Sequence, residues 1–300
     1  MSEDSKSPEK FLEAMSEGIE LSSEGKHEEA ARAFIKAIQL DATQAEAHFF
    51  LGQELNSLQR YTEAVRAFTK ASELDPEDSD SLLGLGFAHY MLDERNRAIE
   101  VLEKAAEMDP EYDEVQLRLG DMYADAGRWE EALESYERVL ASDEDSEEPR
   151  LGQAIAFGHL DRYAEADAVL QELLSKSADS TSTMVSVGGA YLTLGHPADA
   201  LPVLERAFAL EPESELAIFA LARTYTELGR LADAEAMCSR FVQERPDSVD
   251  GHYLLTLVYL GQGKGQEAAT QLEKLAGLDP QLANNLLMQI IQQGPDEEEK

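Results

Sequence analysis

The sequence predicts an all-α fold made of a row of similar helix pairs. A phrase returns on a fixed spacing: RYTEA lies at 60–64, RWEEA at 128–132 and RYAEA at 162–166. The second and third copies begin 68 and 102 residues after the first, and both distances are multiples of 34. A frame starting at Phe11 divides most of the chain into 34-residue blocks without insertion or deletion. Within each block, apolar residues recur every three or four positions, which is typical of amphipathic helices.

The blocks share residues at fixed slots, counted from the first residue of each block. The eight blocks are 11–44, 45–78, 79–112, 113–146, 147–180, 181–214, 215–248 and 249–282. Slot twenty is alanine in every block: Ala30, Ala64, Ala98, Ala132, Ala166, Ala200, Ala234 and Ala268. Slot eight is glycine in five blocks: Gly18, Gly52, Gly86, Gly120 and Gly188. Such constancy predicts one packing arrangement repeated along the chain.

Each block reads as helix, short turn and helix. The turn often holds glycine, and proline near the block's end stops the second helix. Glycine inside a helix costs about 1 kcal/mol relative to alanine. Its recurrence at slot eight therefore predicts that the facing helix approaches closely there. The slot-twenty alanine is expected to lie opposite the glycine, with large slot-24 residues beside it. Replacing Ala132 with leucine is expected to overpack the pair and destabilise it by roughly 1–3 kcal/mol.

The two ends differ from the blocks. Residues 1–10 are expected to be disordered, and 294–300 to form a solvated acidic tail. Residues 283–293 are predicted to form a capping helix over the last block. Its apolar face is marked by Leu282, Leu286, Leu287, Ile290 and Ile291. An alternative use of this helix is to dock a second copy of the chain.

The Gly, Tyr, Ala, Phe and Pro slots resemble those of the tetratricopeptide repeat family. The resemblance covers residues 11–282, although the tryptophan usual at slot four is replaced, for example by Ala14 and His48. It implies a right-handed superhelical solenoid of helix-turn-helix repeats. In that fold the first helix of each pair lines a concave groove.

Charge limits the partners. The 300 residues include 61 acidic and 25 basic residues, a formal net charge of −36. Such a chain repels nucleic acid and anionic membrane surfaces and attracts basic proteins or peptides. The acidity fits either a hydrated, soluble surface or adaptation to high salt. With no apolar leader at the N-terminus, no membrane-length apolar run and a single cysteine, a cytoplasmic location is expected.

The residues give no pattern for catalysis. The six histidines have no metal-ligand spacing, and Cys238 occupies slot 24, where a small buried side chain is expected. Phosphate-binding loops and serine-nucleophile motifs are missing from the sequence. We therefore expect a protein that is not an enzyme and that uses no cofactor or metal.

The resemblance implies that slots two, five, nine, twelve and thirteen face the groove. The predicted groove residues are Phe49, Leu83, Phe87, Tyr90, Leu117, Arg118, Ile155, Val185, Leu192, Phe219, Arg223, Tyr253 and Leu257. This stripe is mostly apolar, with acids at its rim. It predicts a protein or peptide ligand that is apolar with basic flanks, while the two arginines are candidates for orienting a carboxylate. The alternative is that part of the stripe is buried between neighbouring helices.

The function predicted from sequence is a non-enzymatic protein-interaction module that captures a partner peptide or helix in this groove, as an adaptor, assembly factor or chaperone-like protein. The alternative is a self-assembling scaffold, a homo-oligomer joined through the terminal helix and the first block.

Overall fold

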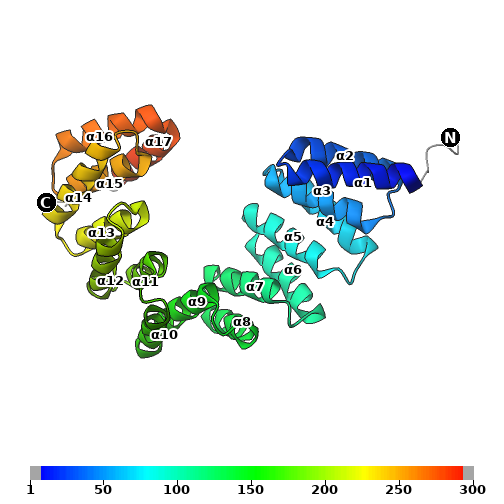
Figure 1. Ribbon diagram of the computed structural model, residues 1–300, viewed down its shortest axis with the longest axis horizontal. Coiled ribbons are helices and arrows are strands. Elements are labelled where there is room, and N and C mark those ends of the chain that lie inside the picture. The colour runs from blue at the N-terminus through cyan, green and yellow to red at the C-terminus, as the bar shows by residue number, and fades with distance from the viewer. Residues whose placement is uncertain (1–7, 293–300) are drawn as a thin grey trace, which may run out of the picture. The chain divides into compact units, whose positions relative to one another are not determined.

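The computed structural model describes residues 8–292, and every regular element within them is an α-helix. Within each of the two units given below, helices that follow one another in sequence pack as antiparallel neighbours (Figure 1). The chain divides into two compact units, Met1–Leu160 and Asp161–Lys300. The division falls inside the fifth block, at the turn between its two helices. The predicted all-α fold of adjacent helix pairs is confirmed.

The helix bounds follow the 34-residue frame. The first unit holds α1 (Pro8–Ser23), α2 (His27–Leu40), α3 (Ala45–Ser57), α4 (Tyr61–Leu74), α5 (Ser79–Met91), α6 (Arg95–Met108), α7 (Asp113–Asp125), α8 (Trp129–Ser142) and α9 (Glu147–His159). The second unit holds α10 (Tyr163–Lys176), α11 (Thr181–Thr193), α12 (Pro197–Leu210), α13 (Glu215–Glu227), α14 (Leu231–Glu244), α15 (Val249–Gly261), α16 (Gly265–Leu278) and α17 (Pro280–Gln292).

The turn inside each block needs a left-handed backbone at slot fifteen. In five blocks this residue is glycine with φ between 70° and 74°: Gly25, Gly127, Gly195, Gly229 and Gly263. In the other three it is Gln59, Asp93 or Asp161, each with φ of 59°. The left-handed residue lets the next amide reach back to the helix, as when Arg60 N–H donates to the Leu55 carbonyl at 2.8 Å. Side chains at this slot therefore carry a conformational cost that glycine does not.

The core of each pair is built around the slot-twenty alanines, which are all at most 2% exposed. The slot-24 side chain, however, lies closest to the slot-eight glycine. A Cβ added to Gly52 would lie 2.8 Å from the Phe68 ring, and one added to Gly84 of the next repeat would lie 2.5 Å from it. The aromatic ring thus fills the space that two glycines leave. This corrects the expectation that the alanine is the main surface opposite the glycine.

Both ends of the described chain are more helical than predicted. The α1 helix begins at Pro8, so residues 8–10 belong to it and not to a disordered segment. Proline suits a first helical turn because its missing N–H would have no intrahelical acceptor there. Similarly, α17 begins at Pro280, where Asp279 accepts a hydrogen bond from the Leu282 amide at 2.9 Å. Residues 1–7 and 293–300, which include the predicted acidic tail, lie outside the described residues.

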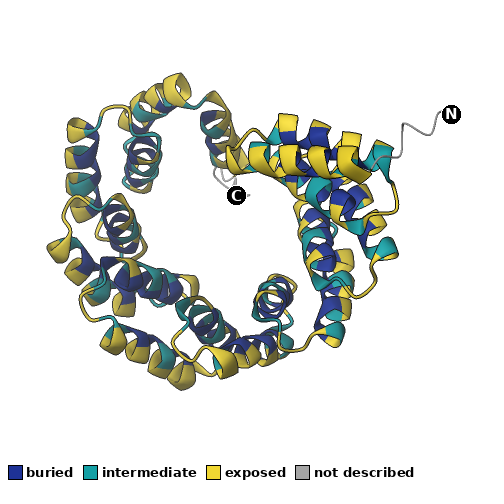
Figure 2. Cartoon of the chain, turned by 45° about the vertical axis from the view of Figure 1, so that its right-hand side comes forward, coloured by how far each residue is buried: buried dark blue, intermediate teal, exposed yellow. Residues whose placement is uncertain are grey.

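Burial follows the helix faces. Buried residues line the sides of helices that meet a neighbour, and exposed residues line the outer sides (Figure 2). No helix in residues 8–292 is both long and apolar enough to cross a membrane.

Candidate functional site

A hollow of about 420 Å³ lies within the first unit, between the first helices of the second, third and fourth repeats (α3, α5 and α7). Its lining is Phe49, Gln53, Asn56, Phe68, Asp80, Leu83, Gly84, Phe87, Tyr112, Glu114 and Arg118. The set combines an apolar floor and wall with a polar edge. We call this set the α3–α5–α7 hollow.

The floor exists because of local packing. Phe68 is fully buried against Gly84, which has no space for a side chain and so leaves the surface recessed. Phe49 packs edge-on to Phe68 with ring centroids 6.0 Å apart. Phe87 stands at the wall and is 42% exposed, touching Tyr61 edge-on at 6.3 Å. An aromatic ring this exposed in a recess is a ready contact for an apolar side chain.

The edge of the hollow is acidic. The hydroxyl of Tyr112, the N-cap of α7, donates to the carboxylate of Asp80 on α5. Burial, together with this hydrogen bond, raises the pKa of Tyr112 to about 12, so the phenol stays neutral near pH 7 and donates to Asp80. Glu114 lies on the same edge and is exposed. A basic side chain of a ligand would find acceptors here.

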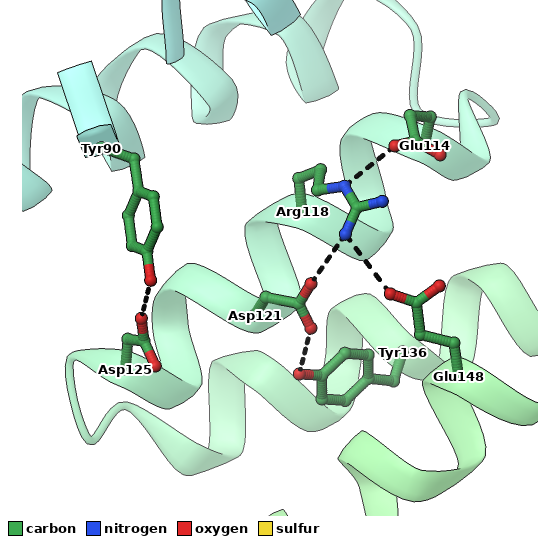
Figure 3. Close-up of polar contacts among 7 residues, drawn as sticks. All are labelled: Tyr90, Glu114, Arg118, Asp121, Asp125, Tyr136 and Glu148. Atoms are coloured by element: carbon green, nitrogen blue, oxygen red, sulfur yellow. Dashed lines mark hydrogen bonds and ion pairs between the residues drawn. The ribbon is translucent and has the colours of Figure 1, made fainter. Parts of the chain in front are cut away.

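Arg118 is held by carboxylates of the protein itself (Figure 3). It donates to Glu114 at 2.9 Å and to Asp121 and Glu148 at 3.3 Å each. Asp121 also accepts a hydrogen bond from Tyr136 at 2.9 Å, and burial raises the pKa of Asp121. Three carboxylates around one guanidinium leave local negative charge. The expectation that Arg118 is available to orient a ligand carboxylate is therefore not supported by this geometry.

Of the predicted groove residues in the first unit, the structure brings Phe49, Leu83, Phe87 and Arg118 together in the hollow. Tyr90 donates to Asp125 at 2.6 Å (Figure 3), and this hydrogen bond, followed by burial, raises the pKa of its hydroxyl.

Like Tyr90, the two remaining predicted groove residues of the first unit do not line the hollow. Leu117 is only 8% exposed and belongs to the core cluster of α5, α6, α7 and α8. Ile155 is half-buried on α9. Burial between neighbouring helices thus explains the loss of Leu117 from the predicted surface.

The predicted groove residues of the second unit mostly take part in packing. Val185 packs on the buried cluster around Met184, and Leu192 is 5% exposed. Phe219 meets Phe241 edge-on at 5.2 Å. Arg223 is exposed but paired with Glu227 at 2.8 Å.

The last two predicted groove residues lie next to the terminal helix. Tyr253 and Leu257 pack against the cluster of Leu275, Ala283 and Leu286, which α16 and α17 contribute. The terminal helix thus takes up part of the surface that the slot pattern assigns to a ligand.

Sequence reasoning missed Tyr112, the N-cap of α7, because it lies at the last slot of its block and outside the slots expected to face the groove. The available signal is an aromatic residue two positions after Pro110 and just before the first helix of the next block. Such a residue can reach back to the acid at slot two of its own block, here Asp80 on α5.

Groups that could support chemistry are few in the described chain. Cys238 is 1% exposed, and burial raises the pKa of its thiol to about 12, which disfavours a reactive thiolate. Residues 8–292 contain no group of three or more His, Cys, Asp or Glu side chains placed to hold a metal ion.

Comparison with known proteins adds the family. One tetratricopeptide repeat model matches residues 55–116, 94–150 and 191–258, more than half of the chain, and a second matches 15–79. The chain has no significant match among curated proteins.

Solved structures resemble it in fold. A tetratricopeptide repeat protein from Parabacteroides merdae is similar with a TM-score of 0.68 and 17% identity, over 83% of this chain and 99% of that one. Yeast Tom70 is similar with a TM-score of 0.66 and 16% identity, over 88% of this chain and 57% of that one. Pseudomonas aeruginosa PilF is similar with a TM-score of 0.54 and 18% identity, over 70% of this chain and 95% of that one. The chain belongs to the tetratricopeptide repeat family.

Proposed function

We propose that this chain is a non-enzymatic, cytoplasmic protein-interaction module that binds an apolar partner segment with basic flanks in the α3–α5–α7 hollow. Tetratricopeptide repeat proteins are generally protein-interaction modules. The observation that carries the proposal is Phe87, which is 42% exposed at the wall of a recess floored by Phe49 and Phe68. An adaptor, assembly factor or chaperone-like protein would use such a site.

The chemistry of the ligand follows from the lining. The partly exposed Phe49, Leu83 and Phe87 favour one apolar side chain as the anchor, since burying it removes apolar area from water at both surfaces. Asp80 and Glu114 at the edge favour lysine or arginine beside that anchor. Arg118 is already held by three carboxylates, so a ligand carboxylate would meet net repulsion there.

A peptide test can separate anchored binding from plain charge attraction. The probe is a labelled amphipathic peptide of leucine and lysine, and its counterpart carries glutamate in place of lysine. We expect the lysine peptide to bind, the glutamate peptide to bind far more weakly, and added salt to weaken the complex. Fluorescence polarisation measures both affinities.

Phe87→Asp is the decisive variant, with Ile35→Asp as its control. Both residues are similarly exposed, at 42% and 44%, and both changes add one negative charge, but Ile35 lies on α2 outside the hollow. We expect Phe87→Asp to weaken binding about tenfold or more, which corresponds to about 1.4 kcal/mol, and Ile35→Asp to leave it nearly unchanged. If both variants bound the peptide as tightly as the wild type, or more tightly, charge alone would attract the peptide and the proposed site would be wrong.

A further inference from the structure

The outer side of α17 exposes apolar side chains that nothing in the described chain covers. Leu287 is 41% exposed, Met288 53% and Ile291 64%. Leu287 and Met288 lie four and three residues before Ile291, so the three side chains share one face of the helix. The inner side is different: Leu286 is buried, and Leu282 and Ile290 pack on the cluster at the end of the second unit. We call the three exposed residues the α17 patch.

The charge of α17 is as unusual as its exposure. None of the residues Pro280–Gln292 is charged, although the chain as a whole has a net charge of −36. Among the described helices only α11 is also free of charged residues, and its exposed residues are the small polar Ser182 and Thr193. The α17 patch is therefore an apolar surface on an uncharged helix within a strongly acidic chain.

The two terminal sequences that flank the described residues are poor in apolar side chains. The sequence 293–300, QGPDEEEK, has no large apolar residue, and 1–7, MSEDSKS, has only Met1. A basic partner would gain nothing from α17, because the helix offers no carboxylate to pair with it. A second copy of this chain is itself acidic, so most of the chain's surface would repel it. The uncharged α17 patch would not.

We infer that two copies of this chain associate through the α17 patch, packing helix against helix about a two-fold axis. A two-fold contact closes at the dimer. At about 20 Å, a helix of this length forms a small interface, so the dimer is weak and concentration-dependent.

The expected salt dependence is distinctive. Apolar contacts persist in salt, while repulsion between the two acidic chains is screened, the screening length falling from about 10 Å at about 0.1 M to about 3 Å at about 1 M salt. Dimerisation should therefore tighten several-fold over this range. This behaviour is opposite to that expected for peptide binding in the α3–α5–α7 hollow, so the two sites can be tested separately.

Sedimentation equilibrium of the full chain over a wide concentration range, at both salt levels, tests the inference. Ile291→Glu should be monomeric throughout, whereas Gln289→Glu, which adds the same charge at another exposed position of α17, should keep most of the dimer. Because Ile291 is largely exposed, its variant should retain the wild-type circular dichroism and melting temperature.

Several results would overturn the inference. One is a wild-type chain that stays monomeric at high salt and high concentration. Another is equal loss of the dimer in both α17 variants, which would place the contact elsewhere on the helix. A third is loss of the dimer in Leu12→Glu on α1, 63% exposed in the wild type, but not in Ile291→Glu, which would indicate a contact through the first repeat.

Discussion

Leu83 and Phe87 on α5 occupy the same repeat slots as Tyr253 and Leu257 on α15, but the two pairs have different environments. The α5 pair borders an open hollow, and Phe87 remains 42% exposed. The α15 pair packs against a cluster that includes Ala283 and Leu286 of α17. A slot in the repeat thus indicates where a side chain points, but not whether a neighbour covers it.

The difference comes from the helices nearby. Beside the α5 pair, α7 contributes Glu114 and Arg118, which form a polar edge and leave the apolar floor open. Near the α15 pair, α17 contributes small and apolar side chains that close the contact. In a stack whose repeats touch only their neighbours, the sequence of the adjacent repeat therefore decides between binding surface and core.

The largest effect is expected at the floor of the hollow. Phe68→Ala removes a fully buried ring held between Gly52 and Gly84 and should destabilise the first unit by about 3–5 kcal/mol. Urea unfolding followed by circular dichroism measures the loss. A loss below about 1 kcal/mol would show that the structure collapses into the space, and that the ring does not hold the recess open.

Aspartate substitutions at slots five and nine test the comparison directly. Tyr253→Asp should destabilise the C-terminal end by about 1–3 kcal/mol, because a charge would meet the cluster of Leu275, Ala283 and Leu286. Phe87→Asp should change stability by no more than about 0.5 kcal/mol, since its ring is substantially exposed. Hydrogen exchange of the α15 and α17 amides locates the first effect. If both variants lost the same stability, Tyr253 would be no more tightly packed than Phe87.

The turns offer a stabilising change. Gln59 holds a left-handed conformation with φ of 59° at the slot where five other blocks have glycine. Gln59→Gly should stabilise the chain by up to about 1 kcal/mol, and the reverse change Gly25→Ala should destabilise it by a similar amount. Thermal melting of both variants checks the pair. If the melting temperature moved in the same direction in both variants, the left-handed backbone would not be the cause of the changes.

The smallest effect is expected from Asp121. Its pKa is raised by burial, so the unfolded chain loses this proton first, near pH 3.9, and the folded chain loses it at higher pH. Its ionisation therefore lowers stability as pH rises from about 3.9 through the folded pKa. Because the side chain is 42% exposed, the change should stay below about 1 kcal/mol.

Asp121→Asn keeps an acceptor for the Tyr136 hydroxyl but cannot ionise. Relative to the wild type, this variant should become more stable between about pH 4 and pH 7, which urea unfolding at both values measures. If the free energies of unfolding of the two proteins differed by the same amount across this pH range, the raised pKa of Asp121 would be contradicted.

The sequence by itself determined the helix pairs and their core. The 34-residue period placed the helix boundaries to within a few residues, because amphipathic spacing and turn residues act locally. The alanine at slot twenty was recognisable as core for the same reason: only a small side chain fits where two helices meet closely, and all eight are buried.

Only the tertiary structure decided which apolar side chains stay open. Leu117 and Phe87 both belong to the predicted groove, but Leu117 joins the core of its unit while Phe87 remains exposed. Likewise, Ile290 and Ile291 are adjacent in sequence, but one packs inward and the other faces solvent. The reason is physical: exposure depends on what residues distant in the sequence bring alongside, and that information is not contained in one repeat.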